Sequence, residues 1–159
     1  MSDLLPITVR RAGPADAAEI ARLNRLFNQC DEPAEAYAQR LQAACRVDTP
    51  LLAEIGGRCM GTANLRLVPQ VFYPEPYAEL TELFVEEPYR RRGAARALLA
   101  ALEDLARAAG AHEVVVRTDF YNHPAQSLYR ACGYVHQDIA LVKALQPEHN
   151  SLVDAAPGT

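Results

Sequence analysis

The segment 78–110 joins a strand pattern to a helix pattern through a short run of arginines. Residues 78–85, AELTELFV, have the composition of a strand, which Pro88 ends. Beyond Gly93 the apolar residues recur at helical spacing, at Ala95, Leu98, Leu99, Leu102, Leu105 and Ala106. Gly110 follows as the expected C-terminal cap. Because both the helix stripe and the strand must bury an apolar face, this segment predicts a layered α/β fold.

The patterns around this segment predict a mixed α/β chain with a twisted central sheet and helices on both faces. The expected order is β-α-α-β-β-β-α-β-α-β-β. The elements are expected at 7–12, from Asp16, from Pro33, at 51–55, 58–68 and 78–85, from the arginine run through Ala108, at 113–118 and 122–132, with one or two strands within 134–145. Gly56-Gly57 is the expected turn of a β-hairpin. Since EVVVRT (113–118) is apolar on both faces, we expect this strand to be central.

The composition of the chain is that of an ordinary globular protein. The 159 residues are half apolar and 23% charged, with a net charge of −4, and this length buries a core without disulfides or metal. We expect one domain at 1–145 and a flexible tail at 146–159. No apolar run approaches the roughly 18 residues of a membrane span, and the N-terminus lacks a secretory signal pattern. The four cysteines are scattered, which predicts reduced thiols, no metal site and a cytoplasmic protein.

Four of the sixteen basic side chains crowd around Gly93, and they are Arg90, Arg91, Arg92 and Arg96. A helix N-terminus offers unpaired N–H groups and a positive partial charge, so it attracts anions. Gly93 permits close approach, Ala94 and Ala95 keep the first turn open, and arginines add charge-assisted bonds to phosphate. The segment is not a Walker loop, because no G-K-[ST] follows, and it is not a dinucleotide-binding fingerprint, because two of the three required glycines are missing. The run therefore predicts a phosphate site, with a solvated surface as the alternative.

Two motifs together carry a resemblance to a known family. The first is [QR]-x-x-G-x-[GA] at 90–95, between the strand and the helix. The second is N-x-x-A-x-x-L-Y-x-x-x-G-[FY], whose fixed positions are Asn122, Ala125, Leu128, Tyr129, Gly133 and Tyr134. In this order and spacing, the pair resembles the GNAT superfamily of acetyl-CoA-dependent N-acetyltransferases. The resemblance covers roughly residues 7–145.

The resemblance implies an acetyl-CoA site. The pyrophosphate would be held at the first motif, by Arg90, Arg91, Arg92, Gly93, Ala94, Ala95 and Arg96. The pantetheine arm would lie like an added strand where the sheet splays at a bulge, bonded to the backbone of Leu83, Phe84 and Val85. Asn122, Ala125 and Tyr129 match cofactor-binding positions of the second motif.

The resemblance also implies direct attack of an amine on acetyl-CoA in a ternary complex. Tyr129 matches the general acid that protonates the departing thiolate. Glu79 is our first choice as general base, and Glu82, Asp119 or a water chain are the alternatives. Strict alternation along the strand places Glu79 and Thr81 on one face and Glu82 on the other. A backbone N–H near Val85 is expected to stabilise the oxyanion.

The acceptor is expected between the first two helices and the loop before the motif strand. The substrate-binding candidates are Phe27, Tyr37, Tyr73 and Glu82, since aromatic and acidic groups suit a cationic amine. A small primary amine (a polyamine, amino acid or aminoglycoside) ranks above a protein N-terminus or lysine, because RTDFYN is two residues longer than the corresponding segment of peptide-specific members. The same aromatic residues suit a homodimer interface.

Two further classes of function stay open. A non-catalytic acyl-CoA-binding regulatory domain would keep the phosphate site without needing Tyr129. A nucleic-acid-binding module would explain the arginines without coenzyme A, but it requires basic residues on several elements. Because the other arginines are dispersed among carboxylates, we expect no nucleic-acid or membrane partner.

Overall fold

The turn at Gly56-Gly57 organises the central part of the sheet. Strands β2 (Asp48–Ile55) and β3 (Arg58–Val68) meet there, and Gly56 and Gly57 have φ angles of 57° and 79°. Two consecutive positive φ angles are characteristic of a type I′ turn, which glycine adopts without strain. The strands pair antiparallel, so the predicted hairpin is confirmed.

The computed structural model describes residues 6–44, 46–137, 139–143 and 145. The chain forms two units that divide between Tyr121 and Asn122. In the first, five strands form one sheet in the order β1-β2-β3-β4-β5. Strand β1 (Ile7–Arg11) pairs antiparallel with β2, β4 (Tyr77–Val85) pairs antiparallel with β3, and β5 (Val115–Val116) pairs parallel with β4.

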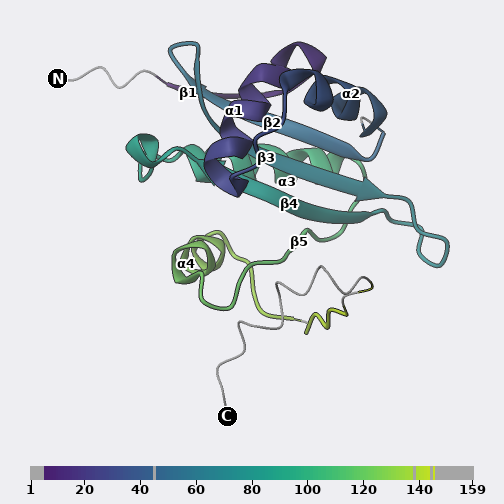
Figure 1. Ribbon diagram of the computed structural model, residues 1–159. Coiled ribbons are helices and arrows are strands. Elements are labelled where there is room, and N and C mark those ends of the chain that lie inside the picture. The colour runs from purple at the N-terminus through teal and green to yellow at the C-terminus, as the bar shows by residue number, and fades with distance from the viewer. Residues whose placement is uncertain (1–5, 45, 138, 144, 146–159) are drawn as a thin grey trace. The chain divides into compact units, whose positions relative to one another are not determined.

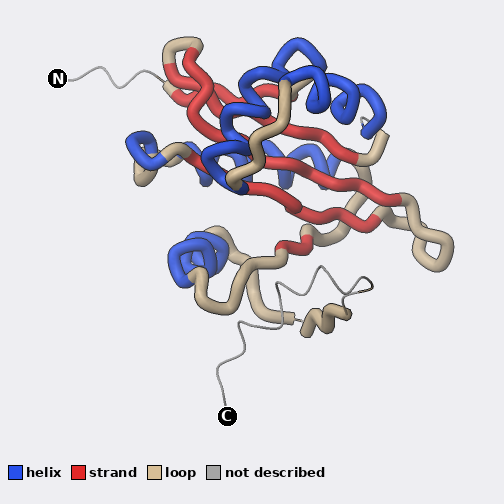
Figure 2. Tube along the Cα trace, in the orientation of Figure 1, coloured by secondary structure: helices blue, strands red, loops and turns tan. Residues whose placement is uncertain are grey.

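Helices cover both faces of this sheet. Helices α1 (Ala17–Asn28) and α2 (Ala34–Ala44) lie on one face, and α3 (Ala94–Ala108) lies on the other (Figure 1). Short 3-10 turns precede α1 and α3, at Pro14–Asp16 and Glu87–Tyr89. The strands and helices form separate layers in the first unit (Figure 2). The predicted mixed α/β fold is therefore confirmed.

The core lies between the sheet and its helices. The fully buried large side chains are Leu23, Leu51, Leu52, Met60, Leu65, Leu80, Leu98, Leu99 and Leu102. Three of these leucines belong to α3, which follows the predicted apolar stripe. Each buried leucine stabilises the fold by roughly 1.5–3 kcal/mol relative to an exposed one. This burial anchors α3 so that its N-terminus keeps a constant place beside the end of β4.

Two sequence predictions about strands are wrong for the described residues. The strand expected at 113–118 is only the two-residue β5, and it lies at the edge of the described sheet rather than at its centre. The strands expected within 134–145 are not formed by the described residues of that segment. A strand requires a hydrogen-bonded neighbour, and apolar pattern alone does not supply one. The segment 146–159, predicted to be a tail, lies outside the described residues.

The second unit contains helix α4 (His123–Ala131), which begins and ends as predicted. The Asn122 Oδ1 atom accepts a hydrogen bond from the Ala125 N–H at 3.2 Å, and Pro124 occupies the first turn. Gly133 follows the helix with a φ of 91°. No helix in the described part of the chain is long and apolar enough to cross a membrane.

Candidate functional site

A β-bulge interrupts β4 at Thr81. Asn64 on β3 pairs with Glu82, whereas the next residue, Leu65, pairs with Leu80, so Thr81 is the extra residue. The Asn64 Nδ2 donates to the Thr81 Oγ1 at 2.8 Å. Thr81 and Glu82 consequently line the same cavity. The prediction that they face opposite sides is wrong, because strict alternation holds only where no residue is inserted.

Beyond the bulge, one edge of β4 is open. Strand β5 pairs with β4 only at Glu79 and Leu80, so the edge over 81–85 has no partner strand among the described residues. On the other side, the Glu86 N–H donates to the Met60 carbonyl at 2.9 Å. Since neighbouring residues of a strand point their backbone groups to opposite sides, the N–H and C=O of Val85 face the open edge. The Val85 carbonyl accepts a hydrogen bond there from Arg90 Nε at 2.9 Å.

The loop from β4 to α3 presents an uncapped helix N-terminus. Gly93 is the N-cap residue with a φ of 93°, no side chain caps this end, and the first turn contains no acidic residue. Arg91 also has a positive φ, of 64°. A β-carbon on Gly93 would meet only the Ile7 Cδ1 at 3.9 Å, so conformation rather than space favours glycine there. The first-turn N–H groups thus remain available to an anion.

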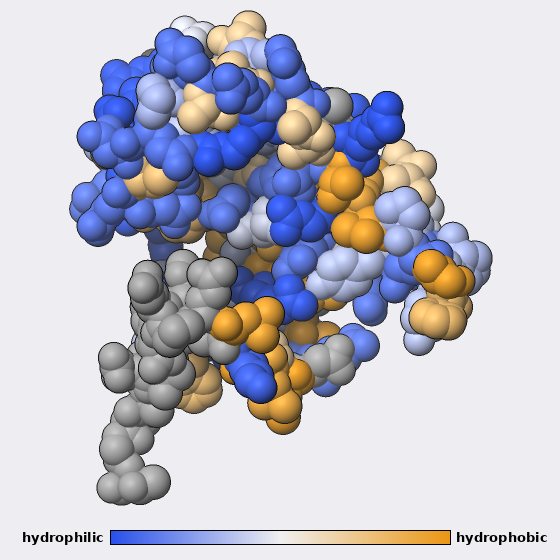
Figure 3. All heavy atoms as spheres, turned by 45° about the vertical axis from the view of Figure 1, so that its right-hand side comes forward, coloured by the Kyte–Doolittle hydropathy of each residue, from blue (hydrophilic) through white to orange (hydrophobic). Residues whose placement is uncertain are grey.

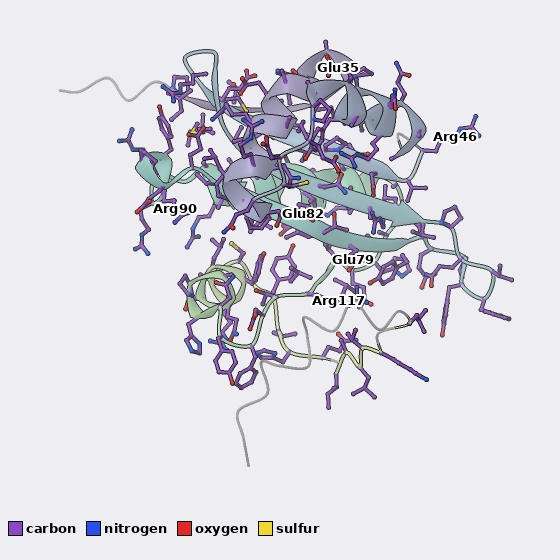
Figure 4. The ribbon with its side chains drawn as sticks, in the orientation of Figure 1. Glu35, Arg46, Glu79, Glu82, Arg90 and Arg117 are labelled. Atoms are coloured by element: carbon purple, nitrogen blue, oxygen red, sulfur yellow. The ribbon has the colours of Figure 1, made fainter. Side chains whose placement is uncertain are left out.

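Aromatic rings support the arginines of this loop. Arg90, labelled in Figure 4, lies over the Phe84 ring at 6.0 Å. Arg92 and Arg58 lie over the Tyr89 ring, at 5.6 and 5.3 Å. Arg58 comes from the start of β3, and the sequence pattern carried no signal that it joins this cluster.

Glu86, just after the end of β4, forms an ion pair with Arg22 on α1. Its carboxylate is almost fully buried and accepts a hydrogen bond from Arg22 Nη1 at 2.7 Å. Arg22 Nη2 also donates to the Cys59 carbonyl at 3.0 Å, which ties α1 to β3. These bonds hold the segment that leads into the arginine loop.

The two candidate bases on β4 have different surroundings. Glu79 forms an ion pair with Arg117, which also donates to the Tyr77 hydroxyl at 3.4 Å, and Figure 4 shows Glu79 and Arg117 close to one another. Glu79 does not line the cavity. Glu82 does line it, and partial burial raises the pKa of its carboxyl, against smaller opposite effects of Asn28 and Arg66. Asp119, the third candidate, accepts a hydrogen bond from the Tyr121 N–H at 2.9 Å.

The cavity has a volume of about 420 Å³ and lies between α1, α2 and strands β2 to β4. Three of the four predicted substrate-binding residues line it, namely Phe27, Tyr37 and Glu82. The Phe27 ring stacks on Phe84, with centroids 5.1 Å apart. Tyr73 is not among the lining residues and is 61% exposed on the loop between β3 and β4. Apolar side chains stand out on an otherwise mostly hydrophilic face (Figure 3).

Charged residues that the sequence analysis did not select also line the cavity. Arg66 donates to both carboxylate oxygens of Asp48, with Nε and Nη2, at 2.9 and 3.0 Å. Arg40 lies over the Tyr37 ring at 4.6 Å and forms an ion pair with Glu32. Asp48 and Arg66 are direct partners across the β2–β3 hairpin. A bulge between Ala53 and Glu54 shifts this register by one residue, so counting outward from the glycine turn would have paired Asp48 with Leu65 and missed this pair.

In the second unit, Tyr129 is partly buried on α4. Its ring lies 5.6 Å from that of Tyr134, and the Tyr134 N–H donates to the Tyr129 carbonyl at 3.0 Å. Burial raises the pKa of the Tyr129 phenol, so it keeps its proton through the neutral range. Cys132 is partly exposed.

A model of the acetyltransferase (GNAT) family matches residues 18–134, which is well over half of the chain. The chain belongs to the GNAT acetyltransferase family. It is therefore an enzyme of a family that uses acetyl-CoA, and the resemblance drawn from the two motifs is confirmed.

Relatives in this family act on different amines. The chain is 32% identical over 131 residues to an aminoglycoside N(6′)-acetyltransferase type 1 from Stenotrophomonas maltophilia, covering 80% of this chain and 85% of that protein. It is 31% identical over 133 residues to the N-alpha-acetyltransferase RimI from Mycobacterium tuberculosis, covering 84% and 81%. Its fold matches the aminoglycoside acetyltransferase meta-AAC0020 from an uncultured soil sample, solved with sisomicin, at a TM-score of 0.77 and 19% identity, covering 88% and 97%.

Proposed function

We propose that this GNAT enzyme transfers the acetyl group of acetyl-CoA to a primary amine of a small molecule, by direct attack in a ternary complex. The observation that carries the proposal is the open edge of β4 beside the uncapped N-terminus of α3. These two features present a row of backbone groups for an extended chain and a set of N–H groups for an anion. Coenzyme A has the matching chemistry, an amide-containing arm that ends in a diphosphate.

The residues present fit this cofactor. The backbone from Arg91 to Arg96 would hold the diphosphate, because Gly93 starts the helix without a capping side chain. The arginines there would add charge-assisted hydrogen bonds. Leu83 and Val85, alternate residues on the open edge, would bond the pantetheine amides. Asn122 and Ala125 remain assigned to the cofactor by their motif positions. Acetyl-CoA supplies an acetyl group activated as a thioester.

We assign the catalytic roles to groups of this chain as follows. Glu82 is the general base, because it lies in the cavity with a raised pKa, whereas Glu79 is occupied by Arg117. The Val85 N–H on the open edge is the donor for the carbonyl oxygen of the acetyl group. Tyr129 is the general acid by its place in the second motif, and its raised pKa keeps the phenol protonated.

A small-molecule acceptor is supported by the aminoglycoside acetyltransferase relative and by the cavity of about 420 Å³ between helices and sheet. The RimI relative, named as an N-alpha-acetyltransferase, favours a protein N-terminus as the second candidate. The two candidates share the cofactor site and differ only in what enters the acceptor cavity.

Calorimetric titration with acetyl-CoA tests the cofactor site. The double variant Arg92→Glu, Gly93→Asp should bind at least about tenfold more weakly, since a charge-assisted hydrogen bond contributes roughly 1.5–3 kcal/mol. The matched control is Arg107→Glu, Gly110→Asp, which makes the same two substitutions at the other end of α3 and should keep wild-type affinity. Equal binding by both variants would contradict the proposal.

A further inference from the structure

The charges in the acceptor cavity limit what kind of amine it can hold. Two carboxylates and two guanidinium groups line it, from Asp48, Glu82, Arg40 and Arg66. Arg66 neutralises Asp48 through two hydrogen bonds, and Arg40 is neutralised by Glu32, which lies outside the lining. Glu82 forms no ion pair with any residue in the described ranges. Glu82 is therefore the lining carboxylate that forms no ion pair among the described residues, and Arg66 attracts it only from a distance.

The same cavity offers unused hydrogen-bond donors. Arg66 bonds Asp48 with Nε and Nη2, and its Nη1 donates to no residue in the part of the chain that is described. Arg40 uses Nη2 for Glu32, and its guanidinium is kept over the ring of Tyr37. A guanidinium has five N–H donors and accepts no hydrogen bond. Such groups bind oxygen acceptors and cannot bind an ammonium group, which has donors only.

We propose that the acceptor is a small amine with a single positive charge, whose other polar groups are oxygen acceptors such as a carboxylate, and not a polycation. The inference rests on the proposed function, because it takes this cavity to be the acceptor site. Glu82 binds the ammonium group, and Arg66 and Arg40 bind the oxygen end. A diamine or aminoglycoside would place a further ammonium beside these guanidinium groups. The volume of about 420 Å³ is near the lower end for ligand cavities, which also suits a small acceptor.

The test uses two series of ligands that differ at one end only. Linear ω-amino carboxylates of three to six carbons are compared with diamines of the same lengths, by calorimetric titration into the protein saturated with coenzyme A. The tightest amino carboxylate should bind at least about tenfold more tightly than its matched diamine, because the second ammonium of the diamine cannot accept the hydrogen bonds that the guanidinium groups donate to a carboxylate. Binding is measured rather than turnover, so a ligand that is not acetylated still reports on the cavity.

Two variants then test the role of Arg66. Arg66→Gln leaves Asp48 unpaired, so it should weaken the amino carboxylate about tenfold and strengthen the diamine. The double variant Asp48→Asn, Arg66→Gln removes both charges, so it should weaken the amino carboxylate without favouring the diamine. Arg46→Gln is the matched control, because Arg46 is exposed before β2 and outside the lining (Figure 4).

The outcomes separate this inference from the proposed function. Diamines that bind as tightly as amino carboxylates would overturn it, as would no binding by either series. Equal effects of Arg66→Gln and Arg46→Gln would overturn it as well. The titration with coenzyme A comes first on each sample, and its failure would count against the proposed function instead.

Discussion

Replacing Gly61 by alanine should strain the pairing of β3 with the end of β4. A β-carbon at this position would lie 2.8 Å from the Phe84 carbonyl oxygen and 3.1 Å from the Val85 Cγ2. Because the closest contact is with backbone, no change of rotamer can relieve it. Gly61 is the direct cross-strand partner of Val85, so the strand that must move is the one proposed to bind the cofactor.

We expect Gly61→Ala to lower both the stability of the fold and the affinity for acetyl-CoA. Overpacking of this kind destabilises a fold by roughly 1–3 kcal/mol, and the backbone contact favours the upper half of that range. Relief of the contact displaces Phe84 and Val85 by some tenths of an ångström. Since a misplacement of about 1 Å can cost roughly a hundredfold in activity, we expect the affinity for acetyl-CoA to fall roughly threefold to tenfold.

Urea unfolding measures the stability and calorimetric titration with acetyl-CoA measures the affinity. Gly13→Ala is the matched control, because nothing lies within 4 Å of its added β-carbon and its φ is −128°. This control should change the free energy of unfolding by less than about 1 kcal/mol, in the stabilising direction, since alanine restricts the unfolded chain. If Gly61→Ala were as stable as Gly13→Ala, the argument from close contact would be refuted.

Three more predictions follow from pKa shifts. Burial raises the pKa of Glu82, so wild-type kcat/KM should rise as pH rises through that pKa and the carboxyl loses its proton. Glu82→Gln should lower the rate about a hundredfold and remove this rise with pH. If the dependence of kcat/KM on pH between 4 and 9 were the same in the variant, Glu82 would be excluded as the base. Tyr129→Phe should lower kcat at least about tenfold in thiol-release assays, while the affinity for acetyl-CoA stays within about twofold. Unchanged turnover would exclude Tyr129 as the general acid, and loss of acetyl-CoA binding would indicate a structural role. Arg10 lowers the pKa of Asp16, so the stability from this pair is present above the unfolded pKa and is lost as pH falls through the lower folded value. Asp16→Asn should therefore cost roughly 0.5–1 kcal/mol at pH 7, given the partly exposed Arg10. In urea unfolding this cost should shrink as pH falls below the unfolded pKa of Asp16, and a cost that does not change with pH would contradict the ion pair.

Local patterns were sufficient wherever structure depends on neighbours along the chain. The turn at Gly56-Gly57, the start of α3 at Gly93 and the cap of α4 at Asn122 all appear where the sequence predicts them. Each depends on the φ preference of glycine or on a side chain that bonds a backbone group three residues away. The two motifs that carry the family resemblance are likewise contiguous segments of chain.

Tertiary structure decided the features that depend on pairing between distant segments. The bulge at Thr81 brings Glu82 into the cavity, and Glu79 forms an ion pair with Arg117, which is why we propose Glu82 rather than Glu79 as the base. The strand expected at 113–118 shrinks to two residues because strand length is set by hydrogen-bonded partners. The sequence by itself determined the fold class, the place of the arginine loop before α3 and the helix ends, since these depend on local conformational preference. Only the register between strands decided which charges meet in the cavity, because one inserted residue moves every later side chain to the opposite face.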